Sequence, residues 1–174
     1  MKQFFIYSLL FVACQVSYGQ KKNNYKKQNT MDSSVITTFT FTKDFYYIFN
    51  NGTSTTLTSE DLIQIDTCLK QYIEGYNAAQ RVILQEKKKK YPQYQFNEAE
   101  DFFIDLKQYK RQYVAIINSK GEKEVWINCF CGHQHDKYWK ESIIMVSDGG
   151  NCYFNLKINL TTHTCYDFIV NGQA

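Results

Sequence analysis

One long amphipathic segment, residues 58–92, decides the fold, and it reads TSEDLIQIDTCLKQYIEGYNAAQRVILQEKKKKYP. Thr58 and Asp61 have the spacing of a capping box, which predicts a helix start. Tyr91-Pro92 predicts its end, because the residue before a proline avoids the α region. Apolar residues recur between these ends at spacings of three and four, which places them on one helix face. They are Leu62, Ile65, Leu69, Tyr72, Ile73, Tyr76, Ala79 and Ile83.

Strand patterns precede this helix. Apolar and aromatic residues alternate with threonine over residues 35–41, and an aromatic run at residues 45–50 leads into Asn51-Gly52. Because Asn-Gly tolerates the positive φ values of a tight turn, we expect a hairpin whose return strand covers residues 53–57.

The chain after the helix predicts an antiparallel meander. Residues 113–118 and 122–131 flank one glycine-containing turn, and residues 141–147 and 151–160 flank another. A last strand is predicted at residues 165–170. Between helix and meander, residues 92–110 stay ambiguous, because the same residues suit a short helix capped by Asn97 or the start of a strand.

Together these elements predict an α+β fold. The apolar stripe of one long amphipathic helix is expected to pack on a curved antiparallel β-meander, in a single domain at residues 35–174. The order of elements resembles the cystatin-like and NTF2-like architectures. Likeness of architecture implies no activity.

Composition limits the classes of partner. The chain has 174 residues, of which 44% are hydrophobic and 17% aromatic, as in an ordinary folded domain. Its formal net charge of +3 is too small to indicate a nucleic-acid partner.

The N-terminus has the features of an export signal. Lys2 precedes an apolar stretch at residues 4–13, and small residues before Gln20 predict cleavage there, so that residues 1–19 form a signal peptide. An alternative is lipidation at Cys14, since the residues before it resemble a lipobox. Only that route would attach the protein to a membrane. Residues 20–34, rich in lysine and asparagine, predict a flexible basic tether. We therefore expect a periplasmic or secreted protein, or a lipid-anchored one.

The export prediction determines how many cysteines the mature protein keeps. Cleavage before Gln20 would leave five of the six cysteines, and an odd number leaves at least one unpaired. The pairing we expect is Cys129 with Cys152, because adjacent strands would bring them together; a free, buried state is the alternative. Cys68 is expected in the core beside the helix stripe. Cys165 has the same parity as Asp167 and is expected to face away from the core.

Two cysteines and two histidines are close in sequence: Cys129, Cys131, His133 and His135. These residue types bind zinc, but along one extended strand they would span about 20 Å, whereas zinc holds each ligand within about 2.3 Å. We therefore predict no metal and no cofactor, unless the chain folds back at Gly132.

Catalytic motifs are missing from the sequence. It contains no G-x-S-x-G, no H-E-x-x-H and no glycine-rich phosphate loop. No catalytic residue is predicted. If the helix and sheet enclosed a pocket, Asp105, His163 and Asp167 would be the polar residues available to it.

The C-terminal part carries a resemblance. The strings VWINCFC at residues 125–131, DGGNCYFNLKINL at residues 148–160 and YDFIVNG at residues 166–172 stand in a region, residues 109–174, that resembles small exported proteins of Bacteroidetes-type bacteria. The resemblance implies export from a Gram-negative cell and brings no activity with it.

Two functions follow as hypotheses. The first is an exported, non-catalytic module that binds a protein, peptide or glycan, since export, a tether and an aromatic-rich β domain occur together. The alternative is a small enzyme with a pocket between helix and sheet.

The export prediction can be checked by the intact mass of the protein recovered from its native host. We expect a mass that begins at Gln20. A mass beginning at Cys14 with added acyl chains would show a lipoprotein instead, and an unprocessed mass would contradict both routes.

Overall fold

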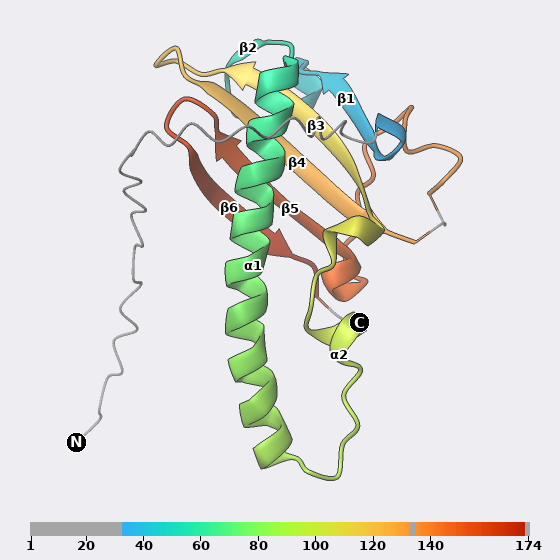
Figure 1. Cartoon of the computed structure of the whole chain (residues 1–174). Helices are drawn as coiled ribbons and strands as arrows, with labels where there is room; N and C mark the ends of the chain where they lie inside the picture. Colours follow the sequence, from blue (N-terminus) through green and yellow to red (C-terminus); the bar gives the residue numbers. More distant parts are fainter. Residues whose placement is uncertain (1–32, 133–134, 173–174) are drawn as a thin grey trace, which may run out of the picture. The chain divides into compact units, whose positions relative to one another are not determined.

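A long helix lies on one face of a mixed sheet in the computed structural model, which describes residues 33–132 and 135–172 (Figure 1). The fold is therefore α+β, as predicted. The expected signal peptide, Cys14 and most of the tether lie outside the described residues. Ser33 and Ser34, expected at the end of the tether, begin a short 3-10 turn instead.

The elements follow one another in this order: η1 (Ser33–Val35), β1 (Ile36–Thr40), η2 (Lys43–Phe45), β2 (Thr53–Ser54), α1 (Ser59–Lys90), α2 (Glu98–Asp101), η3 (Leu106–Gln108), β3 (Tyr109–Ile117), β4 (Lys123–Cys131), η4 (Gly150–Cys152), β5 (Tyr153–Asn159) and β6 (Thr164–Val170).

The predicted ends of α1 are confirmed. The Asp61 backbone N–H donates to the Thr58 hydroxyl at 3.2 Å, and the Thr58 N–H donates to the Asp61 carboxylate at 2.7 Å, so both halves of the capping box form. At the other end Tyr91 is the C-cap, and its N–H donates to the Lys87 carbonyl. Lys123 also donates to Asp61, at 2.6 Å, which ties the start of α1 to the start of β4.

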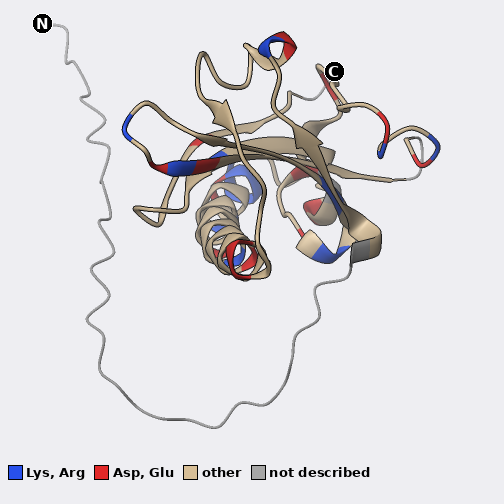
Figure 2. Ribbon diagram, turned by 90° about the horizontal axis from the view of Figure 1, so that it is seen from above, with Lys and Arg blue, Asp and Glu red and all other residues tan. Residues whose placement is uncertain are grey.

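The first half of α1 packs on the sheet and the second half does not. Ile65, Leu69 and Ile73 are buried in the core between α1 and the sheet, as the stripe predicts. Figure 2 shows α1 lying along one face of the sheet. Further along, Leu84 is buried while Ile83 is 41% exposed, so the prediction that Ile83 belongs to the buried stripe was wrong. The reason is a change of partner, because this half of α1 faces the chain that returns after residue 91.

The sheet has the order β1-β3-β4-β5-β6, with β2 also paired to β3. β3 to β6 form the predicted antiparallel meander. The expectation of an entirely antiparallel sheet was wrong, because β1 runs parallel to β3. Parallel neighbours need a long crossover, and α1 between β1 and β3 supplies it.

The predicted hairpin at residues 45–57 was also wrong. Phe45 closes η2, and the chain then brings Ile48 and Phe49 onto the sheet face opposite α1. The return strand shrinks to β2, which pairs with β3. Gly52 turns the chain with φ +140°, and a Cβ there would lie 2.6 Å from Ile116 Cδ1.

Residues 141–147 were predicted as a strand but form part of the β4–β5 connection. Buried side-chain amides replace strand pairing here. Gln112 donates to the carbonyls of Trp139 and Ser142 at 2.6 and 2.7 Å and accepts from the Ile144 N–H at 2.8 Å. Asn128 donates to the Ile144 carbonyl at 2.7 Å. The apolar residues of this segment therefore cover the second face of the sheet, the one opposite α1.

A bulge in β6 changes which side chains face the helix. The register of β5 and β6 shifts between Asn155 and Lys157, and Asp167 has φ +51°. As a result Cys165 and Phe168, an odd number of residues apart, both pack against the core under α1. The expectation that Cys165 faces away from this core was wrong for this reason.

Within the described ranges, no helix has both the length and the apolar character needed to cross a membrane.

Asp61→Asn tests the cap of α1. Burial works to raise the pKa of Asp61, but hydrogen bonds from Lys123 and Thr58 outweigh it and lower the pKa. A lowered pKa in the folded state means that the stabilisation is present above the unfolded value near 4 and is lost as the pH falls through the folded value. We expect the variant to lose about 1 kcal/mol of unfolding free energy at pH 7.

The measurement is urea unfolding at pH 7 and again near pH 3. The difference in unfolding free energy between wild type and variant should be smaller near pH 3. Asp44→Asn, on an exposed residue outside the cap, is the control. An equal difference at both pH values would contradict the prediction.

Candidate functional site

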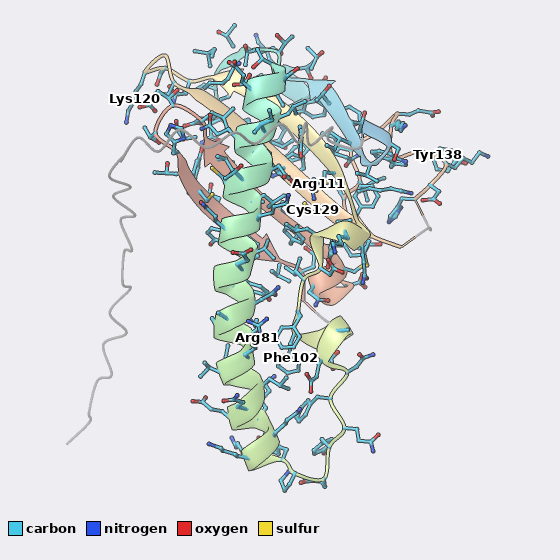
Figure 3. The ribbon with its side chains drawn as sticks, in the orientation of Figure 1. Arg81, Phe102, Arg111, Lys120, Cys129 and Tyr138 are labelled. Carbon is cyan, nitrogen blue, oxygen red and sulfur yellow. A yellow bond between two sulfur atoms is a disulfide. The ribbon has the colours of Figure 1, made fainter. Side chains whose placement is uncertain are left out.

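An open groove of about 1200 Å³ lies where the second half of α1 leaves the sheet. Its walls come from α1, from the segment that runs through α2 to η3, and from the ends of β3, β4 and η4. Figure 3 labels Arg81 on α1 and Phe102 on the segment that faces it.

Two asparagines hold the groove in shape. The Asn77 amide donates to the Ile104 carbonyl at 2.8 Å and accepts from the Ile104 N–H at 2.9 Å, as a strand neighbour would. Asn151 donates to the Phe103 carbonyl at 2.7 Å. Its own carbonyl accepts from the Tyr109 hydroxyl, also at 2.7 Å. The segment at residues 102–105 is therefore fixed on both sides before any ligand arrives.

Cation–π contacts close the outer end. The Arg81 guanidinium carbon lies 5.5 Å from the centroid of the Phe103 ring, and the Lys87 ammonium lies 5.1 Å from that of Phe102. Lys88 forms an ion pair with Glu98 across the same gap. These contacts join α1 to the returning chain by charge and aromatic surface.

A disulfide lines the inner end of the groove, and it joins Cys131 to Cys152 with a Cα–Cα distance of 5.0 Å. The predicted pairing of Cys129 with Cys152 was therefore wrong. Cys129 stands opposite Phe154 in the β4–β5 register, and Phe130 opposite Tyr153, so the next step along β4 brings Cys131 opposite Cys152. Alternation along the strand could not distinguish Cys129 from Cys131, because both side chains lie on the same face of β4.

A second polar group is buried between α1 and the sheet. Arg111 forms an ion pair with Asp66 at 3.2 Å, and Arg111 and Cys129 are labelled behind α1 in Figure 3. Tyr113 is fully buried, and its hydroxyl faces Arg111 without the alignment of a hydrogen bond. Burial raises the pKa of Tyr113 and raises that of Cys129 to about 12, although Arg111 opposes both shifts. Both groups are therefore protonated at neutral pH and unsuited to act as nucleophiles.

The candidate metal ligands are not brought together. Cys131 is in the disulfide, and Cys129 lies on the α1 side of the sheet. His135 contacts the Tyr153 hydroxyl at 3.0 Å on the other side, and His133 lies outside the described residues. Among residues 33–132 and 135–172, no three metal-binding side chains are close enough to share an ion.

The polar residues considered for an enzyme pocket also separate. Asp105 lines the groove and accepts from the Lys107 N–H at 3.2 Å. His163 Nδ1 lies 2.7 Å from Gln64 Nε2, and Asp167 pairs with Lys157 at 3.0 Å. Each has a different partner on a different element, so they do not form one site.

Sequence reasoning missed the groove because its wall comes from residues 92–108, which have no clear period. One signal was available: Asn77 lies on the inner side of α1 and Asn151 beside an apolar strand, both places where a polar side chain needs a specific partner.

Comparisons with protein-family models, curated proteins and solved structures gave no match.

Removing the disulfide tests the framework of the groove. The double variant Cys131→Ala/Cys152→Ala should lose about 3 kcal/mol of unfolding free energy, because the bond closes a loop of some twenty residues in the unfolded chain. Urea unfolding without reductant measures the loss.

Cys129→Ala serves as the control for bonding, since its intact mass should still rise by two daltons for the Cys131–Cys152 bond on reduction. If the double variant and the wild type unfold with the same urea midpoint, the assignment of the Cys131–Cys152 disulfide is contradicted.

Proposed function

We propose that this chain is an exported binding module that holds a basic peptide segment of another protein in the groove beside α1. The observation that carries the proposal is the charge of the lining. Glu98, Asp101, Asp105 and Asp148 contribute carboxylates, whereas Arg81 contributes the one cation among the lining residues that the structure describes.

The charge balance favours a cationic ligand. Lys88 neutralises Glu98, and Arg81 is turned onto the Phe103 ring. Asp105 accepts a hydrogen bond from the backbone N–H of Lys107, which brings no positive charge to this carboxylate, and the Asp148 carboxylate also lines the groove. Lysine or arginine side chains of a ligand would find these carboxylates, and Phe103 offers an aromatic face to the methylene groups beside the charge.

The form of the groove favours a chain segment over a small molecule. It is open to solvent along one side and is not an enclosed cavity, so an extended segment can lie in it without being engulfed. The disulfide and the two asparagine contacts fix its walls, which lowers the ordering cost of binding. The hydroxyls of a glycan could donate to the same carboxylates, but a neutral glycan would bring no positive charge to them.

The alternative, an enzyme with a pocket between helix and sheet, has weaker support. Ile65, Leu69 and Ile73 fill that interface with exposed fractions of 0 to 3%. We retain the cystatin-like or NTF2-like class as a proposal, supported by one long helix across an antiparallel meander; the parallel β1 is a departure from a pure meander. Export through residues 1–19, or lipid attachment at Cys14, is part of the same proposal.

A peptide array tests the function. Fifteen-residue peptides with the same uncharged residues, differing in net charge from strongly positive to strongly negative, are probed with the full chain. We expect binding to the positive peptides only. In solution, Asp105→Asn/Asp148→Asn should weaken binding of a positive peptide about tenfold, a difference of about 1.4 kcal/mol, and should make binding less sensitive to salt.

Asp44→Asn/Glu74→Gln removes the same number of charges from exposed residues outside the groove and is the matched control. Equal loss in both double variants, or no preference for positive peptides, would overturn the proposal. Selective binding to a glycan array would show that the ligand is a glycan and not a basic peptide.

A further inference from the structure

One flank of α1 follows the edge strand β6. Gln64, Cys68 and Tyr72 are four residues apart and therefore lie in a row on the helix surface. At one end of the row, Gln64 lies 2.7 Å from both the Leu160 carbonyl and His163 Nδ1, in the turn that precedes β6. At the other end the Tyr72 ring lies 5.0 Å from the ring of Phe168 in β6.

Cys68 occupies the middle of this row, and Cys165 is the residue of β6 that faces it. Cys165 pairs with Ile158 of β5, whose side chain is in the core under α1, so Cys165 points to the same side. Both cysteines pack against the same core cluster under α1, between the Gln64 contact at one end of the row and the Tyr72 contact at the other. Both are half-buried, so a small reagent can reach them from solvent.

We propose that Cys68 and Cys165 are an oxidisable pair that forms a second disulfide and joins α1 to β6. The fixed contacts on either side set the two residues opposite each other in the reduced protein, so the bond requires no change of register. This inference is independent of the peptide ligand proposed for the groove.

The chemistry of the pair assigns different roles to the two sulfurs. The hydrogen bond from Cys165 lowers the pKa of Cys68 to about 7, against the effect of burial. The same contact, together with burial, raises the pKa of Cys165. Cys68 is thus the more acidic of the two thiols, and its thiolate is the nucleophile in thiol–disulfide exchange.

The oxidant is a low-molecular-weight disulfide. The Cys68 thiolate attacks one of its sulfurs, a mixed disulfide forms, and one small thiolate leaves. Cys165 then gives its proton to water, its sulfur attacks the Cys68 sulfur, and the second small thiolate leaves. The protein loses two electrons to the reagent, whose single disulfide becomes two thiols.

The second bond also accounts for the number of cysteines. Cys131–Cys152 and Cys68–Cys165 would use four of the five cysteines that follow residue 19. The fifth is Cys129, which is fully buried in the core and has a raised pKa. The thiol left unpaired is therefore the one that oxidants reach least easily.

The experiment uses the full chain with Cys14→Ser, so that the thiol outside the described residues is not counted. The protein is equilibrated with oxidised glutathione, unfolded without reductant, treated with N-ethylmaleimide and mapped by peptide mass. We expect one adduct, on Cys129, and a peptide pair linked through Cys68 and Cys165. Adducts on both Cys68 and Cys165, or a link from either to another cysteine, would overturn the proposal.

Alkylation rates test the interaction of the two thiols directly. In the reduced protein, the rate of Cys68 alkylation should rise with a midpoint near pH 7, and Cys165→Ser should move that midpoint upward. Cys129→Ser should leave it unchanged. A Cys68 midpoint that is the same with and without Cys165 would show that the two thiols do not interact.

Discussion

The burial of three side chains of α1 against the sheet is the interaction on which the remaining structure depends. Ile65, Leu69 and Ile73 are between 0 and 3% exposed, and each contributes about 1.5–3 kcal/mol by leaving water. α1 packs along this face and lies between β1 and β3 in the chain. It therefore carries the chain back along the sheet, so that β3 starts from the same end as β1. The parallel pairing of β1 and β3 is the direct consequence.

The groove follows from a difference in length. α1 has 32 residues and is about 48 Å long, whereas a nine-residue strand such as β4 is about 30 Å long. The second half of the helix therefore projects past the strands and needs another packing partner. The returning segment, held by Asn77 and Asn151, provides it and leaves an open space between.

Local signals predicted the parts that local physics determines. The capping box at Thr58 and Asp61, the stop at Tyr91 and the strands β3 and β4 depend on neighbours in sequence. The Cys131–Cys152 pairing, the bulge at Asp167 and the segments that cover the second sheet face depend on contacts between distant residues. Residues 141–147 show the difference, because their apolar residues have a strand pattern, yet the amides of Gln112 and Asn128 hold them on the sheet face without pairing.

A packed apolar stripe alone would leave the rotation of α1 on the sheet weakly determined, because similar side chains can exchange places. Polar contacts on the two flanks of the stripe restrict that rotation. On the flank toward β3, Asp66 pairs with the buried Arg111, and a half-turn of the helix would leave this guanidinium without a counter-charge at a cost of several kcal/mol. On the flank toward β6, Cys68 faces Cys165. The same rotation would separate the thiols, so the ion pair on one side of α1 keeps the cysteine pair on the other side in position to react.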